Sequence, residues 1–337
     1  MSHTDRAQGA SFFPLSRRMA LACLAAPLLA GGAWAQQPWP SKPITLIVPF
    51  PAGGPTDVVS RIVGKELSDR LKQPVIVENR AGASGSIAAN QVKRMAPDGY
   101  TLMTLATPTL FAPLFYKGAG YDVTKDFTPI SMVYDLPIVM VVNPSKLPGV
   151  KTLQQLIDTA RAQKDPLNYT TSGAGSFGHM SMELLKDLGK FDMQHVAYKG
   201  GVPAITDTIG GQVPIMYADL VAALPHIKSG KLVAVAVGSP ERVSVVPEIK
   251  TIAEQGIQGF SAVSLGALLG PKGMPADVVA RLNKEVKDIL AQKEVQERIV
   301  GAGAIARYMT AAQLQQSLTQ DYAKWSKVVK EKGMVAE

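Results

Sequence analysis

Residues 44–57 read Ile44-Thr-Leu-Ile-Val-Pro-Phe-Pro-Ala-Gly-Gly-Pro-Thr-Asp57, an apolar run that leads into a turn rich in glycine and proline. The apolar run predicts a buried strand, and apolar residues at helical spacing from Val58 to Leu67 predict a helix after the turn. A strand, a glycine-rich loop and a helix in this order are typical of α/β proteins with parallel strands. This unit therefore predicts the fold class.

The same order recurs along the chain. Strand 75–79, loop 81–86, a helix ending near Met95 and strand 100–106 complete a βαβαβ half. A second region repeats the plan, with expected strands 138–142, 167–171, 194–198, 214–217 and 232–237 and expected helices 152–162, 179–188, 203–210 and 220–228. Two further helices are expected at 275–300 and 311–332.

The length of 337 residues favours two domains, because one hydrophobic core rarely grows this large. We expect residues 36–136 plus 255–337 to form domain 1, and residues 137–254 to form an inserted domain 2. Each domain is expected to be a mostly parallel sheet flanked by helices.

The first 35 residues have the pattern of a cleaved export signal. Arg17 and Arg18 precede an apolar run at 19–30, and Ala33-Trp-Ala35 offers a small-residue cleavage site near Ala35. The run is shorter than the roughly 20 residues that a spanning helix needs. General secretion and twin-arginine export both remain open. The single cysteine, Cys23, lies inside this signal, so the mature chain is expected to contain no disulfide or thiolate metal site.

The composition is that of an ordinary globular protein, with 46% hydrophobic and 18% charged residues. The net charge is +8, and loss of a signal with three arginines and one aspartate leaves +6. The basic residues are scattered, so we expect no nucleic-acid partner. A mild positive field favours anionic solutes.

Three loops, 51–56, 81–86 and 172–178, each follow an expected strand and precede an expected helix. The first amides of a helix lack internal acceptors and carry the positive end of the helix dipole, so they bind carboxylates well. The hydroxyls of Thr56, Ser172 and Ser176 are candidate additional donors. The alternative is that these glycine-rich turns only connect strands to helices.

Signals for catalysis are weak. Gly173-Ala-Gly-Ser-Phe-Gly178 matches the dinucleotide fingerprint, but Lys199 and Gly200 stand where an acid for the ribose is expected. No phosphate-binding loop, nucleophile elbow or zinc motif occurs in the sequence. We expect no enzyme activity, no cofactor, no metal and no catalytic residue, and a nicotinamide-dependent enzyme is the rival hypothesis.

Individual polar residues have two interpretations each. Asp57 stabilises its helix through the dipole or orients the loop. His179 faces a bound anion or caps its helix. Asp219 meets an amino or hydroxyl group of a ligand or caps the helix that follows. The stripe of Leu314, Leu318, Tyr322, Trp325 and Val329 is interpreted as buried packing rather than a cofactor site.

Together with these loops, several longer motifs resemble the tripartite tricarboxylate transporter receptors, the TctC-like or Bug family of periplasmic binding proteins. They are Trp39-Pro-Ser-Lys-Pro43, Ile47-Val-Pro-Phe-Pro-Ala-Gly-Gly-Pro-Thr-Asp57, Gln73-Pro-Val-Ile-Val-Glu-Asn-Arg80, Pro97-Asp-Gly-Tyr-Thr-Leu102, Asp126-Phe-Thr-Pro129, Ser172-Gly-Ala-Gly-Ser176 with His179, His195-Val-Ala-Tyr-Lys-Gly200 and Gly210-Gly-Gln-Val213. The motifs cover nearly the whole mature chain. Ala197 and Pro214 depart from the proline and aspartate more common in the family.

The resemblance implies a two-domain Venus-flytrap fold of the type II periplasmic class, which closes over a carboxylated solute. It implies a periplasmic monomer whose partners are the solute and the permease subunits of the transporter, with a sensor subunit of a signalling system as the alternative. The ligand-binding residues expected here are Phe50, Pro51, Ala52, Gly53, Gly54, Thr56, Asp57, Thr107, Ser172, Gly173, Ala174, Gly175, Ser176, His179 and Asp219.

Overall fold

The computed structural model describes residues 38–116 and 118–334. The expected export signal, its twin arginines, Cys23 and the cleavage site near Ala35 lie outside the described residues. Within the described part, no helix is both long and apolar enough to cross a membrane.

The described chain is an alternation of strands and helices. The strands are β1 (Ile44–Val48), β2 (Val75–Asn79), β3 (Thr101–Ala106), β4 (Phe127–Val142), β5 (Asn168–Thr171), β6 (Gln194–Ala197), β7 (Ile215–Asp219), β8 (Val233–Val237), β9 (Val263–Pro271) and β10 (Ile305–Met309). The helices are α2 (Pro55–Leu71), the short 3-10 turn η2 (Ala83–Gly85), α3 (Ser86–Lys93), α4 (Thr107–Phe115), α5 (Leu153–Ala162), α6 (Phe177–Gly189), α7 (Gly201–Ile209), α8 (Leu220–Lys228), α9 (Ala276–Leu290), α10 (Lys293–Gly301) and α11 (Ala311–Glu331).

The described strands join in one curled sheet with the order β2-β1-β3-β9-β4-β7-β5-β6, and β8 and β10 also pair with β4. The pairs β1–β2, β1–β3, β5–β6 and β5–β7 are parallel, as the βαβ units require. All pairings of β4, and that of β3 with β9, are antiparallel. The sheet is therefore mixed: the parallel arrangement expected from the sequence holds away from β4 and β9.

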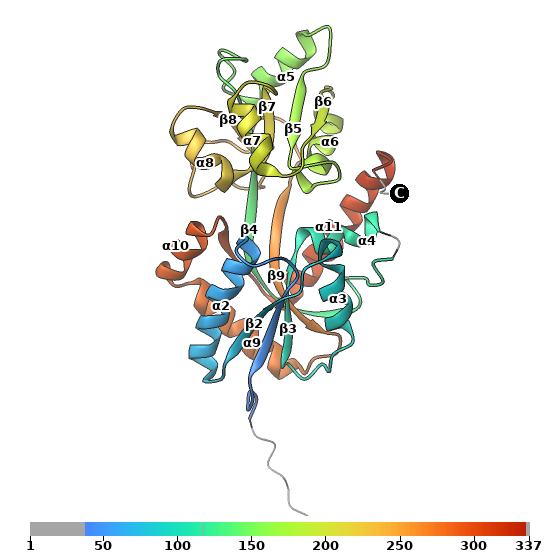
Figure 1. The fold of residues 1–337 in the computed structure, drawn as a ribbon, viewed down its shortest axis with the longest axis vertical. Helices are drawn as coiled ribbons and strands as arrows, with labels where there is room; N and C mark the ends of the chain where they lie inside the picture. The colour runs from blue at the N-terminus through green and yellow to red at the C-terminus, as the bar shows by residue number, and fades with distance from the viewer. Residues whose placement is uncertain (1–37, 117, 335–337) are drawn as a thin grey trace, which may run out of the picture. The chain divides into compact units, whose positions relative to one another are not determined.

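Strands β4 and β9 connect two strand groups (Figure 1). One group contains β1, β2, β3 and β10, and the other contains β5, β6, β7 and β8. The first half of β4 pairs with β9 and β10, whereas its second half, from Ile138, pairs with β7 and β8. The sequence predicted only residues 138–142 of this strand. Pro129 and Pro137 obscured the rest, because proline usually ends a strand; here the register shifts next to Pro129, and proline is tolerated at such irregularities.

Two other elements differ from expectation. The helix expected at 275–300 is two helices, α9 and α10, because Gln292 adopts an extended conformation with ψ 126. The break turns α10 so that it contacts α2 and β10. Helix α4 was not predicted, since Pro113 interrupts its pattern; it nevertheless begins with proline in its first turn, a position that proline favours.

The C-terminal helix α11 confirms the predicted apolar stripe. Leu314, Leu318, Trp325 and Val329 are buried, and Tyr322 packs against the same core. The Trp325 ring meets the Phe177 ring edge-on, with 5.0 Å between centroids. Helix α11 contacts both α4 and α6, two of the helices whose first residues line the cavity described next.

Candidate functional site

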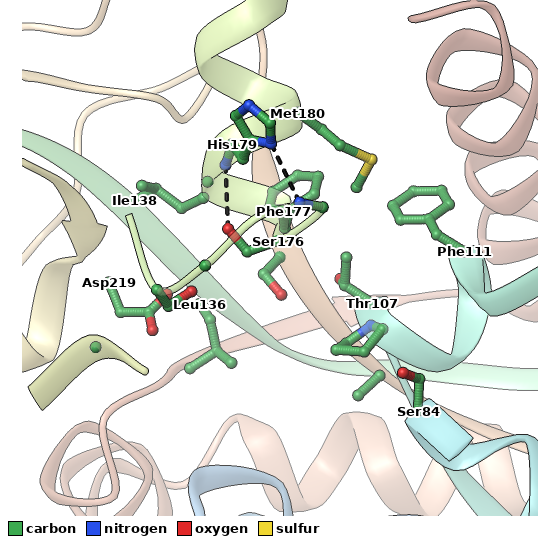
Figure 2. Close-up of a pocket in the computed structure, with 18 of the residues that line it drawn as sticks. Ser84, Thr107, Phe111, Leu136, Ile138, Ser176, Phe177, His179, Met180 and Asp219 are labelled. Carbon is green, nitrogen blue, oxygen red and sulfur yellow. Dashed lines mark hydrogen bonds between the residues drawn. The ribbon is translucent and has the colours of Figure 1, made fainter. Parts of the chain in front are cut away.

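A cavity of about 990 Å³ is lined by residues from both strand groups. Its walls include the first turns of α2, α4 and α6, the end of β7 and the middle of β4. Figure 2 shows Ser176 and His179 above the centre of this cavity, with Asp219 on one side and Thr107, Ser84 and Phe111 on the other. Parallel strands deliver their carboxyl ends to one edge of a sheet, which explains why these loops converge.

Asp57 holds the loop before α2 in place. One carboxylate oxygen accepts a hydrogen bond from the Gly53 amide at 2.9 Å, and the other accepts one from Asn79 Nδ2 at 2.8 Å. Arg61 adds an ion pair at 3.0 Å. Burial alone would raise the pKa of Asp57, but the hydrogen bonds from Arg61, Gly53 and Asn79 outweigh it and lower that pKa.

Thr56 is positioned by a residue that the sequence did not single out. The Tyr134 hydroxyl on β4 donates to Thr56 Oγ1 at 2.9 Å, and both side chains are buried. Because Oγ1 accepts this bond, the Thr56 hydroxyl keeps its own hydrogen for another acceptor in the cavity. The first-turn amides of Thr56 and Asp57 also lack an acceptor within α2.

Ser176 caps helix α6 and leaves the next amides free of helical partners. Its Oγ accepts from the His179 amide at 3.2 Å and donates to Thr171 Oγ1 at 3.2 Å (Figure 2 draws the first of these). The Ser176 hydroxyl therefore donates its hydrogen to Thr171, and its expected contact with an anion stays a prediction. The helix itself offers no acceptor to the amides of Phe177 and Gly178.

His179 does not cap its helix, since Ser176 does. Its Nδ1 accepts a hydrogen bond from the Gly175 amide at 3.1 Å, which ties the ring to the loop (Figure 2). The ring stacks on His195, and Thr171 Oγ1 lies 2.9 Å from His195 Nε2. Burial lowers the pKa of His179, and burial together with the charge of His179 lowers the pKa of His195 to about 4. Both rings are neutral at neutral pH.

Thr107, in the first turn of α4, connects this turn to β9. Its Oγ1 accepts a hydrogen bond from the Leu265 amide at 2.7 Å, and the side chain is buried. Pro108 follows it and contributes no amide, so Thr107 and Thr109 supply the first-turn amides of α4.

Asp219 ends β7 at the N-cap position of α8, but its side chain makes no capping hydrogen bond. Asp219 is an exposed residue, and its exposed surface opens into the cavity. Protein atoms pack around the other sides of the carboxyl. Burial raises the pKa of Asp219, and no charged neighbour opposes this. Of the two interpretations that the sequence offered, the capping one is therefore wrong.

The structure brings most of the predicted residues together at one cavity. The lining includes Phe50, Pro51, Ala52, Gly54, Thr56, Thr107, Ser172, Gly173, Ala174, Gly175, Ser176, His179 and Asp219. Gly53 and Asp57 are not among the lining residues. Their hydrogen bond to each other shapes the loop behind the lining, and their expected contact with a ligand stays a prediction.

Sequence reasoning missed the apolar part of the lining. It is contributed by Phe111, Phe115, Leu136, Ile138, Phe177 and Met180. Phe177 lies inside the Ser172–His179 motif and Met180 follows it directly, so their position in the sequence was an available signal. Leu136 and Ile138 reach the cavity only because β4 pairs with both strand groups.

Comparison with known proteins identifies the family. Residues 59–334 match the tripartite tricarboxylate transporter family receptor, TctC, so the chain belongs to this family. It is 35% identical over 317 residues to the Bordetella pertussis (strain Tohama I) protein BugT, covering 94% of this chain and 95% of BugT.

Solved structures of relatives agree. A TctC solute-binding protein from Polaromonas superposes with a TM-score of 0.80 at 26% identity, covering 87% of this chain and 99% of that one. An R. palustris protein solved with adipate has a TM-score of 0.72 at 32% identity, covering 89% and 100%. MatC from Rhodopseudomonas palustris, solved with bound malate, has a TM-score of 0.67 at 33% identity, covering 86% and 100%. The fold is thus that of the periplasmic binding proteins, and the family's members are solute-binding receptors.

Proposed function

We propose that this protein binds a small organic carboxylate in the described cavity and delivers it, in the periplasm, to the membrane permease subunits of a tripartite tricarboxylate-type transporter. The observation that carries the proposal is the convergence of three helix N-termini, those of α2, α4 and α6, on one cavity. Such termini stabilise an anion through free amides and the helix dipole without an arginine. Relatives solved with adipate and malate support a carboxylate ligand.

We propose that the two expected domains, residues 36–136 plus 255–337 and residues 137–254, close over the ligand as a hinge. Strands β4 and β9 pass between the corresponding strand groups and are the natural hinge elements (Figure 1). A ligand that touches both Thr56 and the first turn of α6 stabilises the closed form, because it gains both sets of contacts only there. The closed form is then the one that the permease recognises, and the receptor acts as a monomer.

The test is a thermal-shift screen followed by calorimetry on the purified mature protein, with organic carboxylates and their uncharged amides as matched pairs. We expect at least one carboxylate to raise the unfolding midpoint while its amide does not, since a ligand of the folded state alone stabilises that state. Equal responses to both members of every pair would contradict the proposal.

Two glycine variants test whether the carboxylate binds in this cavity. A Cβ on Gly54 would meet no atom within 4 Å, so Gly54→Val leaves the fold intact and places a side chain among the lining residues. Gly301→Val is the control, because Gly301 has equally open surroundings and lies outside the lining. We expect carboxylate binding to weaken by at least about tenfold in the first variant only.

A further inference from the structure

The charged side chains that line the cavity do not suit a ligand with several carboxylates. Among the described lining residues, Asp219 is the only acidic or basic side chain besides the neutral His179, and no lysine or arginine lines the cavity. The three helix N-termini can serve one carboxylate of a ligand. A second carboxylate would find no cation there and would meet the acid Asp219.

Asp219 lacks a partner within the protein. In the described part of the chain, no hydrogen bond or ion pair involves its carboxyl, and α8 begins without a side-chain cap. The side chain is open to the cavity, so water can hydrate it while no solute is bound. A solute that fills the cavity displaces this water and must replace its hydrogen bonds, because a buried carboxylate without donors is strongly disfavoured.

The remaining surface suits an apolar solute body. Phe111 and Phe177 are stacked with ring centroids 6.1 Å apart, and with Met180 they line the side of the cavity away from Asp219 (Figure 2). Leu136 and Ile138 of β4 line the part near the centre. At about 990 Å³ the cavity is at the upper end of the range for drug-sized ligands.

We infer that the ligand is a monocarboxylic acid with an apolar, chain-like or aromatic body that carries a hydrogen-bond donor, a hydroxyl or a protonated amine, and that Asp219 accepts this donor and selects against dicarboxylates. The inference rests on the proposed function, because the helix N-termini must hold the single carboxylate. Asp219 is the residue that decides specificity. A site built around an acceptor rejects analogues that lack the donor, since the acceptor is then left unpaired.

Two matched ligand series test this by calorimetry near pH 7.5: hexanoate, ε-aminohexanoate and adipate; and benzoate, para-hydroxybenzoate, para-aminomethylbenzoate and terephthalate. Within each series the skeleton is constant and only the far group changes. We expect the best donor-bearing member to bind at least about tenfold more tightly than the dicarboxylate of the same series, since like charges that face each other across a site repel.

Substitutions of Asp219 test whether this side chain causes the preference for donor-bearing ligands over dicarboxylates. Asp219→Asn can both donate and accept, so we expect it to weaken the donor-bearing ligand and to strengthen the dicarboxylate, reversing or abolishing the preference. Asp219→Ser, which also suits an N-cap, is the second variant should the first not fold. Asp158→Asn is the control: it removes the same charge at an exposed position of α5 and leaves the preference unchanged.

The outcomes separate this inference from the proposed function. A dicarboxylate that binds as tightly as, or more tightly than, its donor-bearing analogue would overturn the inference and leave carboxylate binding standing. A preference that survives both Asp219 variants would overturn it as well. Failure of every carboxylate in both series to bind, in a protein that melts cooperatively, would overturn both.

Discussion

The imidazole rings of His179 and His195 stack with 4.0 Å between their centroids and 14° between their planes. One ring belongs to α6 and the other to β6, so the pair fixes the start of α6 against the neighbouring strand. Tyr169 of β5 and Glu183 and Lys186 of α6 are the other titratable groups beside the pair. The stacked arrangement depends on both rings being neutral.

The histidine pair predicts a loss of stability in mild acid. The pKa of His195 falls to about 4 in the folded protein, below its ordinary 6.5, so the unfolded chain binds more protons between those values. The stability that His195 contributes is present above about pH 6.5 and is lost as the pH falls toward 4. We expect the free energy of unfolding of wild type, relative to that of His195→Gln, to fall by on the order of 1 to 2 kcal/mol between neutral pH and pH 4, allowing for partial exposure. Denaturant unfolding at several pH values measures the difference in free energy of unfolding between the two proteins. A difference that stays constant with pH would contradict the prediction.

Asp57→Ala should destabilise the protein and weaken binding. The change leaves the Gly53 amide, Asn79 and Arg61 without their shared acceptor, for which about 2 to 4 kcal/mol is expected. Asp69→Ala is the control on the same helix, because its ion pair with Lys65 is fully exposed and contributes little to stability. Chemical denaturation and calorimetry with a bound carboxylate measure the two effects. Similar losses in both variants would show that the Asp57 bonds do not shape the loop.

Ser176→Ala should lower both stability and affinity. Removing this cap is expected to cost about 1 kcal/mol and to loosen the amides at the start of α6. Thr152→Ala removes the equivalent cap of α5, which lies outside the cavity lining. The control should therefore lose similar stability with unchanged affinity. An affinity loss in both variants would point to a global effect rather than the cavity.

Asp219→Asn should raise stability in the absence of ligand. The pKa of Asp219 is raised by burial, so its ionised form disfavours the folded state above that pKa, and the neutral amide removes the penalty. The gain is expected to be modest, because the side of the carboxyl that opens into the cavity is hydrated. The unfolding midpoint near pH 7.5 measures the change. A lower midpoint would mean that the carboxylate stabilises the fold through contacts with water.

Protonation of Asp219 should also alter ligand choice. Because its pKa is raised, the carboxyl gains a proton at a higher pH than an ordinary aspartate, and its repulsion of a second carboxylate then disappears. We expect adipate affinity to rise as the pH falls. The same titration with Asp219→Asn isolates the ligand's own protonation, and an identical pH dependence in both proteins would count against this.

Gly178→Val should damage fold and binding together, in contrast to Gly54→Val. A Cβ on Gly178 would lie 3.2 Å from the Tyr217 carbonyl oxygen and 3.4 Å from Thr171 Cβ, so the first turn of α6 must shift. Overpacking of this kind is expected to cost about 1–3 kcal/mol. Melting and calorimetry of the two variants side by side would show both losses in Gly178→Val and chiefly the affinity loss in Gly54→Val.

Much of the fold could be predicted because its signals are local. The apolar run before the Pro51 turn, the glycines after strand 75–79 and the alternation of strand and helix follow from backbone sterics and hydrophobic periodicity. The stripe on α11 likewise required only helical spacing. The full extent of β4, by contrast, depends on pairing partners more than a hundred residues away, and its prolines argued against a strand locally.

The candidate site likewise contains residues that could be predicted from the sequence and residues that could not. The loops around Gly54 and Ser176 were predictable, since glycine-rich turns before helices leave amides unpaired. Tyr134 was not, because only its contact with Thr56 gives it a role. The apolar wall of Phe111 and Phe115 was not predictable either, as nothing in the spacing of those residues distinguishes a cavity wall from a core.

By itself, the sequence determined the family, the order of strands and helices, and the loops suited to a carboxylate, because motif spacing and backbone chemistry are properties of neighbouring residues. Only the tertiary structure decided that Asp57 faces away from the cavity while Asp219 opens into it. The two aspartates stand in similar places, next to the start of a helix. What separates them is which neighbours the folded protein supplies. Arg61 forms an ion pair with one carboxylate and Asn79 donates a hydrogen bond to it, whereas the other has no partner among the described residues.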